Sequence, residues 1–195
     1  MKEQLEQFLD NRDRYVICTA DIIYTAYMKP EAEDEVEKKH PLSEEELEMA
    51  KEIEKASPSQ LVKMMRKSLP SHVQMILRKK LLEFDDEVFQ EIAERIISSR
   101  QEVFANHAAY YLLRSAADAR KWIIDNYGEV KSENMKSLLC MVIGVKGNPS
   151  DVPFLMDEAR RFERDFPDES YSQGPVIALE HLEDRWNKGD FPDFV

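Results

Sequence analysis

Apolar residues recur along most of the chain at intervals of three and four, the spacing that lines one face of an α-helix. Val88, Ile92 and Ile96 show this spacing clearly. No stretch alternates apolar and polar residues as a half-buried strand does, and no Asn-Gly or Asp-Gly hairpin turn occurs. The pattern therefore predicts an all-α protein. The expected helices span residues 3–28 with a break near Asn11, 44–55, 58–68, 72–83, 86–98, 100–113, 116–127, 133–146, 149–165 and 171–187.

Several expected helices are preceded by residues that cap a helix N-terminus. Ser43 and Glu46 have the spacing of a capping box, in which each side chain accepts a hydrogen bond from the other residue's backbone N–H. The segment 57–60 repeats this spacing and adds a proline at the first helical position. Further boxes are expected at Ser71 with Gln74, Ser99 with Glu102, Ser115 with Asp118 and Asn148 with Asp151.

The segment GVKGNPSDVPFL at 144–155 has two glycines three positions apart before a helix, as some phosphate-binding loops do. A Walker A loop requires Gly-Lys-Ser/Thr after a strand, and a Rossmann loop requires a strand and three glycines. This segment follows a predicted helix and has neither pattern. A helix end at Gly147 and a helix cap at Asn148 account for it. We therefore interpret the segment as a joint between two helices.

From residue 58 the expected helices form antiparallel pairs that start near residues 58, 86, 116 and 149. Intervals of about 28 to 33 residues are typical of helical solenoids. Phe191 and Phe194 are expected to cover the open end of the last pair. The sequence thus predicts one structural domain. Its parts are an N-terminal helical cap at 1–56 with an acidic loop at 29–41, a repeat region of about four hairpins at 57–187, and a C-terminal tail at 188–195.

A ladder of four aspartates runs through the chain at a constant spacing of 33 residues: Asp85, Asp118, Asp151 and Asp184. The chain has 39 acidic residues, so a ladder of this length arises readily by chance. We therefore do not interpret it as a sign of the repeat.

The net charge of −12 is uneven: residues 1–56 carry −8, residues 57–147 carry +3, and residues 148–195 carry −7. An acidic total argues against binding of nucleic acid or of anionic membranes, because phosphate contacts need local positive charge. The apolar stretch from Tyr15 to Met28 is too short to span a bilayer and contains Asp21. Because the N-terminus also lacks the apolar core of a signal peptide, the chain is predicted to be cytoplasmic, with no membrane partner.

The chain contains residue types that act in catalytic and metal sites, but they do not have the sequence spacing that such sites need. Cys18 and Cys140 lie in apolar helical surroundings and are interpreted as buried thiols in a reducing compartment. No two histidines are close in sequence, and no Gly-x-Ser-x-Gly elbow occurs. We therefore predict no catalytic residue, cofactor or metal site. The four histidines are His40, His72, His107 and His181, and the last three fall in second helices of hairpins, where they could share one groove.

Two segments are candidate sites for a protein partner. The first, NHAAYYLLRSAADARKW at 106–122, contains aromatic and arginine residues of the kind that anchor interfaces, or alternatively pack between helices. Its candidates are His107, Tyr110, Tyr111, Arg114 and Trp122. The second, LVKMMRKSLPSHVQMILRKK at 61–80, lacks acidic residues and interleaves Met and Leu with cations, which favours a groove for an acidic partner. Its candidates are Lys63, Arg66, Lys67, Arg78, Lys79 and Lys80, with a solvated face or a contact to the acidic segment 29–56 as the alternatives.

The stretch LLCMVIGVKGNPSDVPFLMDEARRF resembles a unit boundary of HEAT-like repeats of the phycobilin-lyase-like type. In that pattern an apolar helix ends in glycine, a short Gly/Asp/Asn-Pro turn follows, and the next helix carries Val-Pro-x-Leu. The matching residues are Gly144, Gly147, Asn148, Pro149, Val152, Pro153 and Leu155. The resemblance covers about residues 140–184. It implies antiparallel hairpins stacked as a short right-handed α-α superhelix of HEAT/ARM type, a fold that serves more often as a binding scaffold than as an enzyme.

Together these features favour a non-catalytic protein–protein interaction or regulatory module. An inhibitor or immunity-like protein that masks a basic partner with its acidic surface would fit. One alternative is a HEAT-like glycosylase that removes alkylated bases from DNA, which would need Trp and Asp in a basic concave groove around a flipped base. Another alternative is a structural helical bundle without a repeat.

Overall fold

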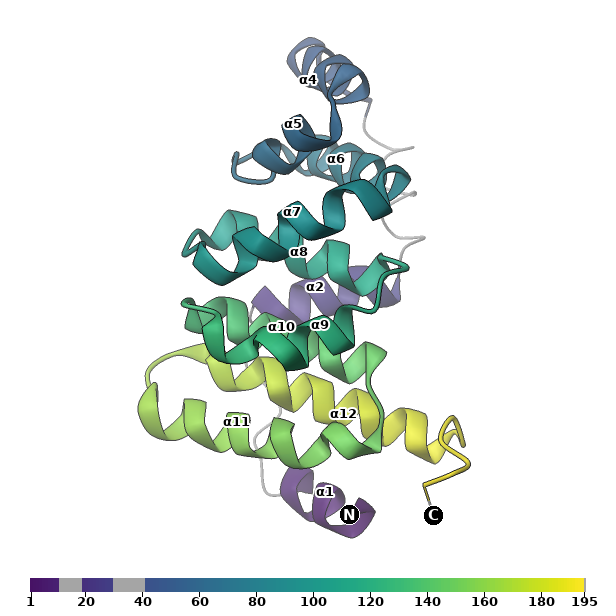
Figure 1. Ribbon diagram of the computed structural model, residues 1–195, viewed down its shortest axis with the longest axis vertical. Helices are drawn as coiled ribbons and strands as arrows, with labels where there is room; N and C mark the ends of the chain where they lie inside the picture. Colours follow the sequence, from purple (N-terminus) through teal and green to yellow (C-terminus); the bar gives the residue numbers. More distant parts are fainter. Residues whose placement is uncertain (11–18, 30–40, 195) are drawn as a thin grey trace.

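The computed structural model describes residues 1–10, 19–29 and 41–194, and every regular element in these ranges is a helix. The protein is therefore all-α, as its apolar periodicity predicts (Figure 1). The eleven described α-helices are α1 (Lys2–Asp10), α2 (Thr19–Met28), α4 (Glu44–Lys55), α5 (Pro58–Met64), α6 (Ser71–Glu83), α7 (Asp85–Ser98), α8 (Glu102–Arg114), α9 (Ala119–Asn126), α10 (Glu133–Lys146), α11 (Val152–Asp165) and α12 (Gln173–Asn187). Single 3-10 turns lie at Tyr127–Glu129, Pro149–Asp151 and Ser170–Ser172.

The helix bounds agree with the sequence expectations to within a few residues from α4 onward. The largest differences are in α5, which ends at Met64 instead of residue 68, and at the starts of α9 and α11, which begin at Ala119 and Val152 instead of residues 116 and 149. The expected break near Asn11 lies outside the described residues, as do Cys18 and His40.

The capping boxes expected at residues 43, 57 and 148 are confirmed. The Ser43 N–H donates to Glu46 Oε2 at 2.9 Å, and the Glu46 N–H donates to Ser43 Oγ at 3.2 Å. The other three boxes are wrong. Ser71 is itself the first residue of α6, and Ser99 and Ser115 are the C-terminal caps of α7 and α8. The short linkers leave each of these two serines in the last turn of the preceding helix, where its N–H is already bonded.

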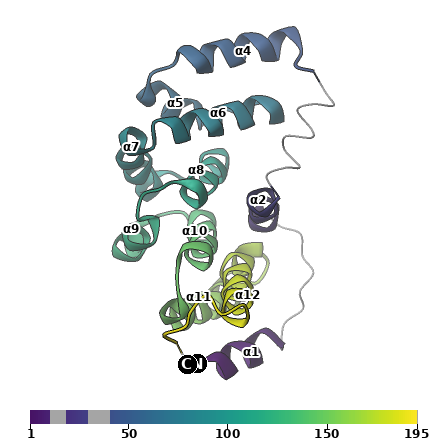
Figure 2. The same ribbon diagram turned by 90° about the vertical axis from the view of Figure 1, so that its right-hand side faces the viewer.

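From α4 onward the helices form two rows (Figures 1 and 2). The inner row contains α4, α6, α8, α10 and α12, each packed against the next. The outer row contains α5, α7, α9 and α11 and lies on one side of the inner row. Each outer helix is followed in the chain by an inner helix, so residues 58–187 form four successive helical hairpins.

The two N-terminal helices pack away from α4. α2 lies across α8, α10 and α12, on the face opposite the outer row, and α1 packs against α12 at the far end of the stack (Figure 2). The Tyr24 hydroxyl of α2 shares a hydrogen bond with Nδ1 of His181, and the two rings meet edge-on with centres 5.4 Å apart. The described helices of the segment 1–56 thus lie at both ends of the stack and on its inner face.

α10 and α12 approach so closely that only very small residues fit between them. A Cβ atom built on Gly144 of α10 would lie 2.3 Å from Cα of Ala178 in α12. One built on Gly174 of α12 would lie 2.1 Å from the carbonyl oxygen of Ser137 in α10. All four residues are buried. Gly144 is therefore required by helix packing, while Gly147, three residues later, caps the end of α10.

The edge where α6, α8 and α10 end and α7, α9 and α11 begin is here called the junction edge. Asp85, Asp118 and Asp151 all occupy the start of an outer helix there, in α7, α9 and α11. The carboxylate of Asp85 accepts from the Ala116 N–H of the next hairpin at 2.6 Å, and Arg120 pairs with Asp151 at 2.6 Å. Asp85 and Asp151 thus connect successive hairpins, whereas Asp118 accepts from the Lys121 N–H and caps the start of its own helix.

Cations reinforce the same edge. Lys146, the last residue of α10, donates to the carbonyl of Ser115 at the end of α8. Arg185 of α12 donates to the carbonyls of Val145 at 2.8 Å and Gly147 at 3.0 Å, at the end of α10. Each cation thus compensates the partial negative charge at the C-terminus of the preceding inner helix.

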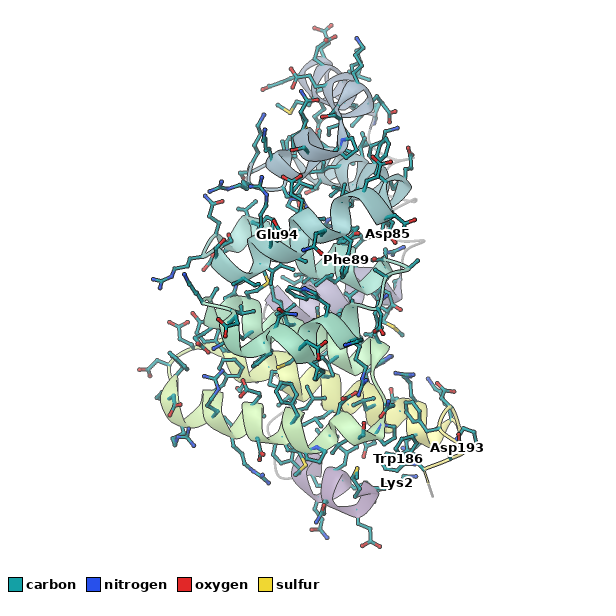
Figure 3. All side chains as sticks on the ribbon, in the orientation of Figure 1. Lys2, Asp85, Phe89, Glu94, Trp186 and Asp193 are labelled. Atoms are coloured by element: carbon teal, nitrogen blue, oxygen red, sulfur yellow. The ribbon has the colours of Figure 1, made fainter. Side chains whose placement is uncertain are left out.

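The C-terminal tail folds back on α12, as the sequence predicts. Nε1 of Trp186 donates to the carbonyl of Phe194 at 3.0 Å. The guanidinium of Arg185 lies 4.5 Å from the ring centre of Phe191. Figure 3 shows Trp186 beside Asp193 of the tail.

None of the helices in the described part of the chain combines the length and the apolar run needed to cross a bilayer.

Replacing Gly144 with alanine tests the close contact between α10 and α12. Alanine should favour the isolated helix by up to ~1 kcal/mol, but its Cβ would collide with the α12 backbone. We expect a net loss of about 1–3 kcal/mol in the free energy of unfolding, measured by urea denaturation. Gly128→Ala is the matched control, because a Cβ there meets no atom within 4 Å. Equal stabilities of the two variants would contradict the packing constraint.

Candidate protein-binding surfaces

The aromatic residues of the segment 106–122 connect neighbouring helices. Tyr111 is 1% exposed, and its hydroxyl donates to the backbone carbonyl of Asp85 at 3.0 Å and to the Asp85 carboxylate. Trp122 of α9 meets Phe89 of α7 edge-on, with ring centres 6.5 Å apart. For these two candidates the structure supports the packing alternative.

A cluster of guanidinium and aromatic groups joins α6 and α8 to α2. The Cζ atom of Arg78 lies 4.2 Å from the ring centre of Tyr110, and that of Arg114 lies 5.0 Å from it. Arg114 also faces the ring of Tyr27 in α2, at 5.9 Å. Tyr110 is 4% exposed, so these cation–π contacts are largely desolvated and correspondingly stronger. The cluster therefore holds α2 against the inner row and is not an open surface.

His107 lies on the same helix and is 1% exposed. Its Nδ1 atom has no hydrogen-bond partner within the described residues. Burial, together with the positive charge of Arg78, lowers the pKa of His107 to about 4. The imidazole is therefore neutral at pH 7 and is a poor candidate for a surface contact.

The basic residues of the segment 61–80 also lie in different parts of the structure and do not form one surface. Lys80 pairs with Glu54 of α4 at 3.2 Å and with Glu83 at 2.7 Å, the intramolecular contact that the sequence left open. Arg78 belongs to the cluster beneath α2, and Lys79 is exposed on α6. Lys63, Arg66 and Lys67 are exposed on α5 and the turn that follows it.

Lys63 and Lys67 border a groove between α4 and α5, which we call the lysine groove. It consists of two adjoining hollows of about 460 Å³ and 300 Å³ that share Glu52, Met64 and Lys67. Lys55 completes the basic rim, and Glu52 is the one acidic residue in the described lining. The apolar residues of the groove are Met49, Ile53, Ala56, Met64, Leu69 and Val73.

The lysine groove lies at an open end of the stack, because α4 is the last helix of the inner row (Figure 2). Its methionines are flexible and polarisable, so they can adapt to different apolar side chains. Three ammonium groups against one carboxylate give the rim a positive field within an acidic protein. The arrangement can hold an amphipathic segment with apolar residues on the floor and carboxylates at the rim.

The α4 side of the groove was missed by sequence reasoning. Met49, Ile53 and Ala56 are spaced four and three residues apart in a helix that is otherwise acidic, which is the signal that could have revealed an apolar face. The pairing of this face with α5 depends on how α4 packs against α6.

The remaining candidates do not form a site. Cys140 is fully buried, and burial raises its thiol pKa, as expected for an inert core residue. His72 lies 3.6 Å from Glu46, whereas His107 is buried in α8 and His181 meets α2, so these histidines do not share a groove. Among the residues that the structure describes, no three His, Cys, Asp or Glu side chains gather as metal ligands.

Comparisons of the chain with models of known protein families, with curated proteins and with solved structures find no match. The HEAT-like resemblance of residues 140–184 thus stays a prediction from the sequence.

Replacing His107 with glutamine tests the low pKa of the buried imidazole. Its pKa is about 4 in the folded chain against an ordinary value of 6.5, so between these pH values the unfolded chain binds a proton that the folded chain does not. The stability that this site contributes is fully present above pH 6.5 and is lost as the pH falls towards 4. The loss amounts to roughly 3 kcal/mol.

The measurement is urea denaturation of both proteins at several pH values. The wild-type chain should lose stability more steeply than His107→Gln as the pH falls from 7 to 4. Parallel curves would show that the imidazole titrates normally.

Proposed function

We propose that this protein is a non-catalytic protein–protein interaction module of helical-repeat type, whose lysine groove binds an acidic amphipathic helix of a partner protein. The observation that carries the proposal is the apolar floor of the groove beneath a rim of Lys55, Lys63 and Lys67. An interface of this kind draws its affinity from the floor and its selectivity and association rate from the rim.

The position of the groove supports a helix as its occupant. α4 ends the inner row, so a helix laid beside it would extend the stack in the way that each inner helix extends the previous one. Leu47 of α4 is 44% exposed and adds apolar surface at this end. Stacked repeats must cover the apolar edge of a terminal unit, which makes an open end a natural docking position.

The two rows of helices support the finer assignment of the fold. We infer a short right-handed superhelix of HEAT-like type, built from the hairpins α5–α6, α7–α8, α9–α10 and α11–α12. The regular contacts along the junction edge and the resemblance of residues 140–184 favour this arrangement over a bundle without a repeat.

No observation on the described residues favours the glycosylase alternative. The described part of the inner face is partly covered by α2, and the two tryptophans pack elsewhere, Trp122 on Phe89 and Trp186 on the tail. A role as an inhibitor fits the proposal if the partner presents its acidic helix beside a basic surface. We also propose that the protein acts in the cytoplasm and without a cofactor.

Charge reversal on the rim tests the groove. Acidic helical peptides selected from a display library on the immobilised wild-type chain should carry apolar residues three and four positions apart. The double variant Lys63→Glu, Lys67→Glu should weaken binding of such a peptide by about tenfold or more, and the loss should shrink at high salt. Fluorescence anisotropy with the labelled peptide measures both effects.

The matched control is Lys131→Glu, Lys188→Glu, which makes the same change in net charge at exposed positions outside the groove. Selected peptides that bind both double variants alike would contradict the proposal. So would a wild-type dimer in light scattering that the groove variant converts to a monomer, because a second copy of the chain would then be the occupant.

A further inference from the structure

A second basic hollow lies on the other side of α5, at the edge where the outer helices end and the inner helices begin. It encloses about 350 Å³ between α5, α7 and α8 and is lined by three arginines, Arg66, Arg95 and Arg100. Ser98 and Ser99 add two hydroxyl groups. We call it the arginine hollow. Two of its residues, Arg95 and Ser98, follow Glu94, which Figure 3 labels, along α7.

The positive charge of the hollow is only partly compensated. Nε of Arg66 donates to the neutral amide oxygen of Gln101 at 2.6 Å. Arg95 pairs with Glu91 at 2.7 Å. Arg100 is exposed and has no carboxylate partner within the described residues. Three guanidinium groups thus face one carboxylate.

The N-terminus of α8, which carries a partial positive charge, also borders the hollow. α8 begins at Glu102, and its cap residue Gln101 makes no side-chain capping bond because its amide oxygen is held by Arg66. The amides of the first turn of α8 are therefore left to other acceptors. Phe104 of that turn is fully buried beside the hollow and gives it a rigid apolar wall.

The bonds that position the arginines are independent of any ligand. Ser59 of α5 donates to Glu91 at 3.4 Å, and Glu91 in turn holds Arg95, so α5 and α7 are tied together beside the hollow. Arg66 ties α5 to α8 in the same way. The hollow is thus formed in the folded chain, and a ligand would have to order little beyond Arg100.

We propose that the arginine hollow binds the dianion of a phosphate monoester. Planar guanidinium groups donate two parallel hydrogen bonds to phosphate oxygens, and serine hydroxyls and helix N-terminal amides are further phosphate donors. The hollow is larger than a single phosphate group, so an ester that carries an organic substituent fills it better than inorganic phosphate. This inference does not rest on the lysine groove, which presents ammonium groups over an apolar floor.

The test is a titration of the full-length, isotope-labelled chain followed by amide NMR shifts. The probes are phosphoserine and inorganic phosphate, with sodium chloride at matched ionic strength as the blank. Saturable shifts should be confined to residues 98–104 and to the Nε signals of the three arginines. Tighter binding of phosphoserine supports an ester as the ligand, whereas tighter binding of inorganic phosphate would overturn that assignment.

Arg100→Gln should weaken the binding of the preferred probe by about tenfold, because it removes a charged hydrogen-bonding group. It should leave the fold intact, since the side chain has no described partner to lose. Lys121→Gln is the matched control, an exposed cation on α9. Equal shifts with chloride, shifts spread over the surface, or unchanged binding by Arg100→Gln would overturn the proposal.

Discussion

The close contact between α10 and α12 is the constraint on which the rest of the stack depends. Gly144 against Ala178 and Gly174 against Ser137 allow the two backbones to touch. This contact brings α12 near enough for Arg185 to reach the carbonyls at the end of α10. It also sets the surface on which α2 and α1 pack, since both contact α12. A larger residue at either glycine would shift α12 and with it both N-terminal helices.

Polar contacts along the junction edge connect the other hairpins of the stack to one another. Neighbouring hairpins are connected there by Asp85 with Ala116, Lys146 with Ser115, and Arg120 with Asp151. The Asp151 side chain is 5% exposed, so its charge requires the guanidinium partner and the Asn148 N–H that it accepts from. These contacts fix the register of one hairpin on the next, which apolar packing alone specifies less strictly.

The short helix α5 divides two different basic surfaces. Lys63 and Lys67 lie on the lysine groove, whose floor is apolar, whereas Arg66 lines the arginine hollow, whose other groups are polar or charged except for Phe104. In the lysine groove, ammonium groups lie above methionine side chains, which suits an extended acidic surface of a partner. In the arginine hollow, planar guanidinium groups lie beside hydroxyl groups, which suits one compact dianion. Both basic surfaces thus adjoin α5, within a chain whose net charge is negative.

The sequence by itself determined the helices and many of their ends. The box of Ser43 with Glu46 and the joint at Gly147 and Asn148 are bonds between residues a few positions apart, so the local sequence specifies them. Only the tertiary structure decided that Gly144 serves packing, that α2 packs on α8, and that Met49 and Lys63 border one groove. These relations join residues on different helices. The apolar periodicity of a helix shows which face is buried, but it does not specify which neighbouring helix packs against that face.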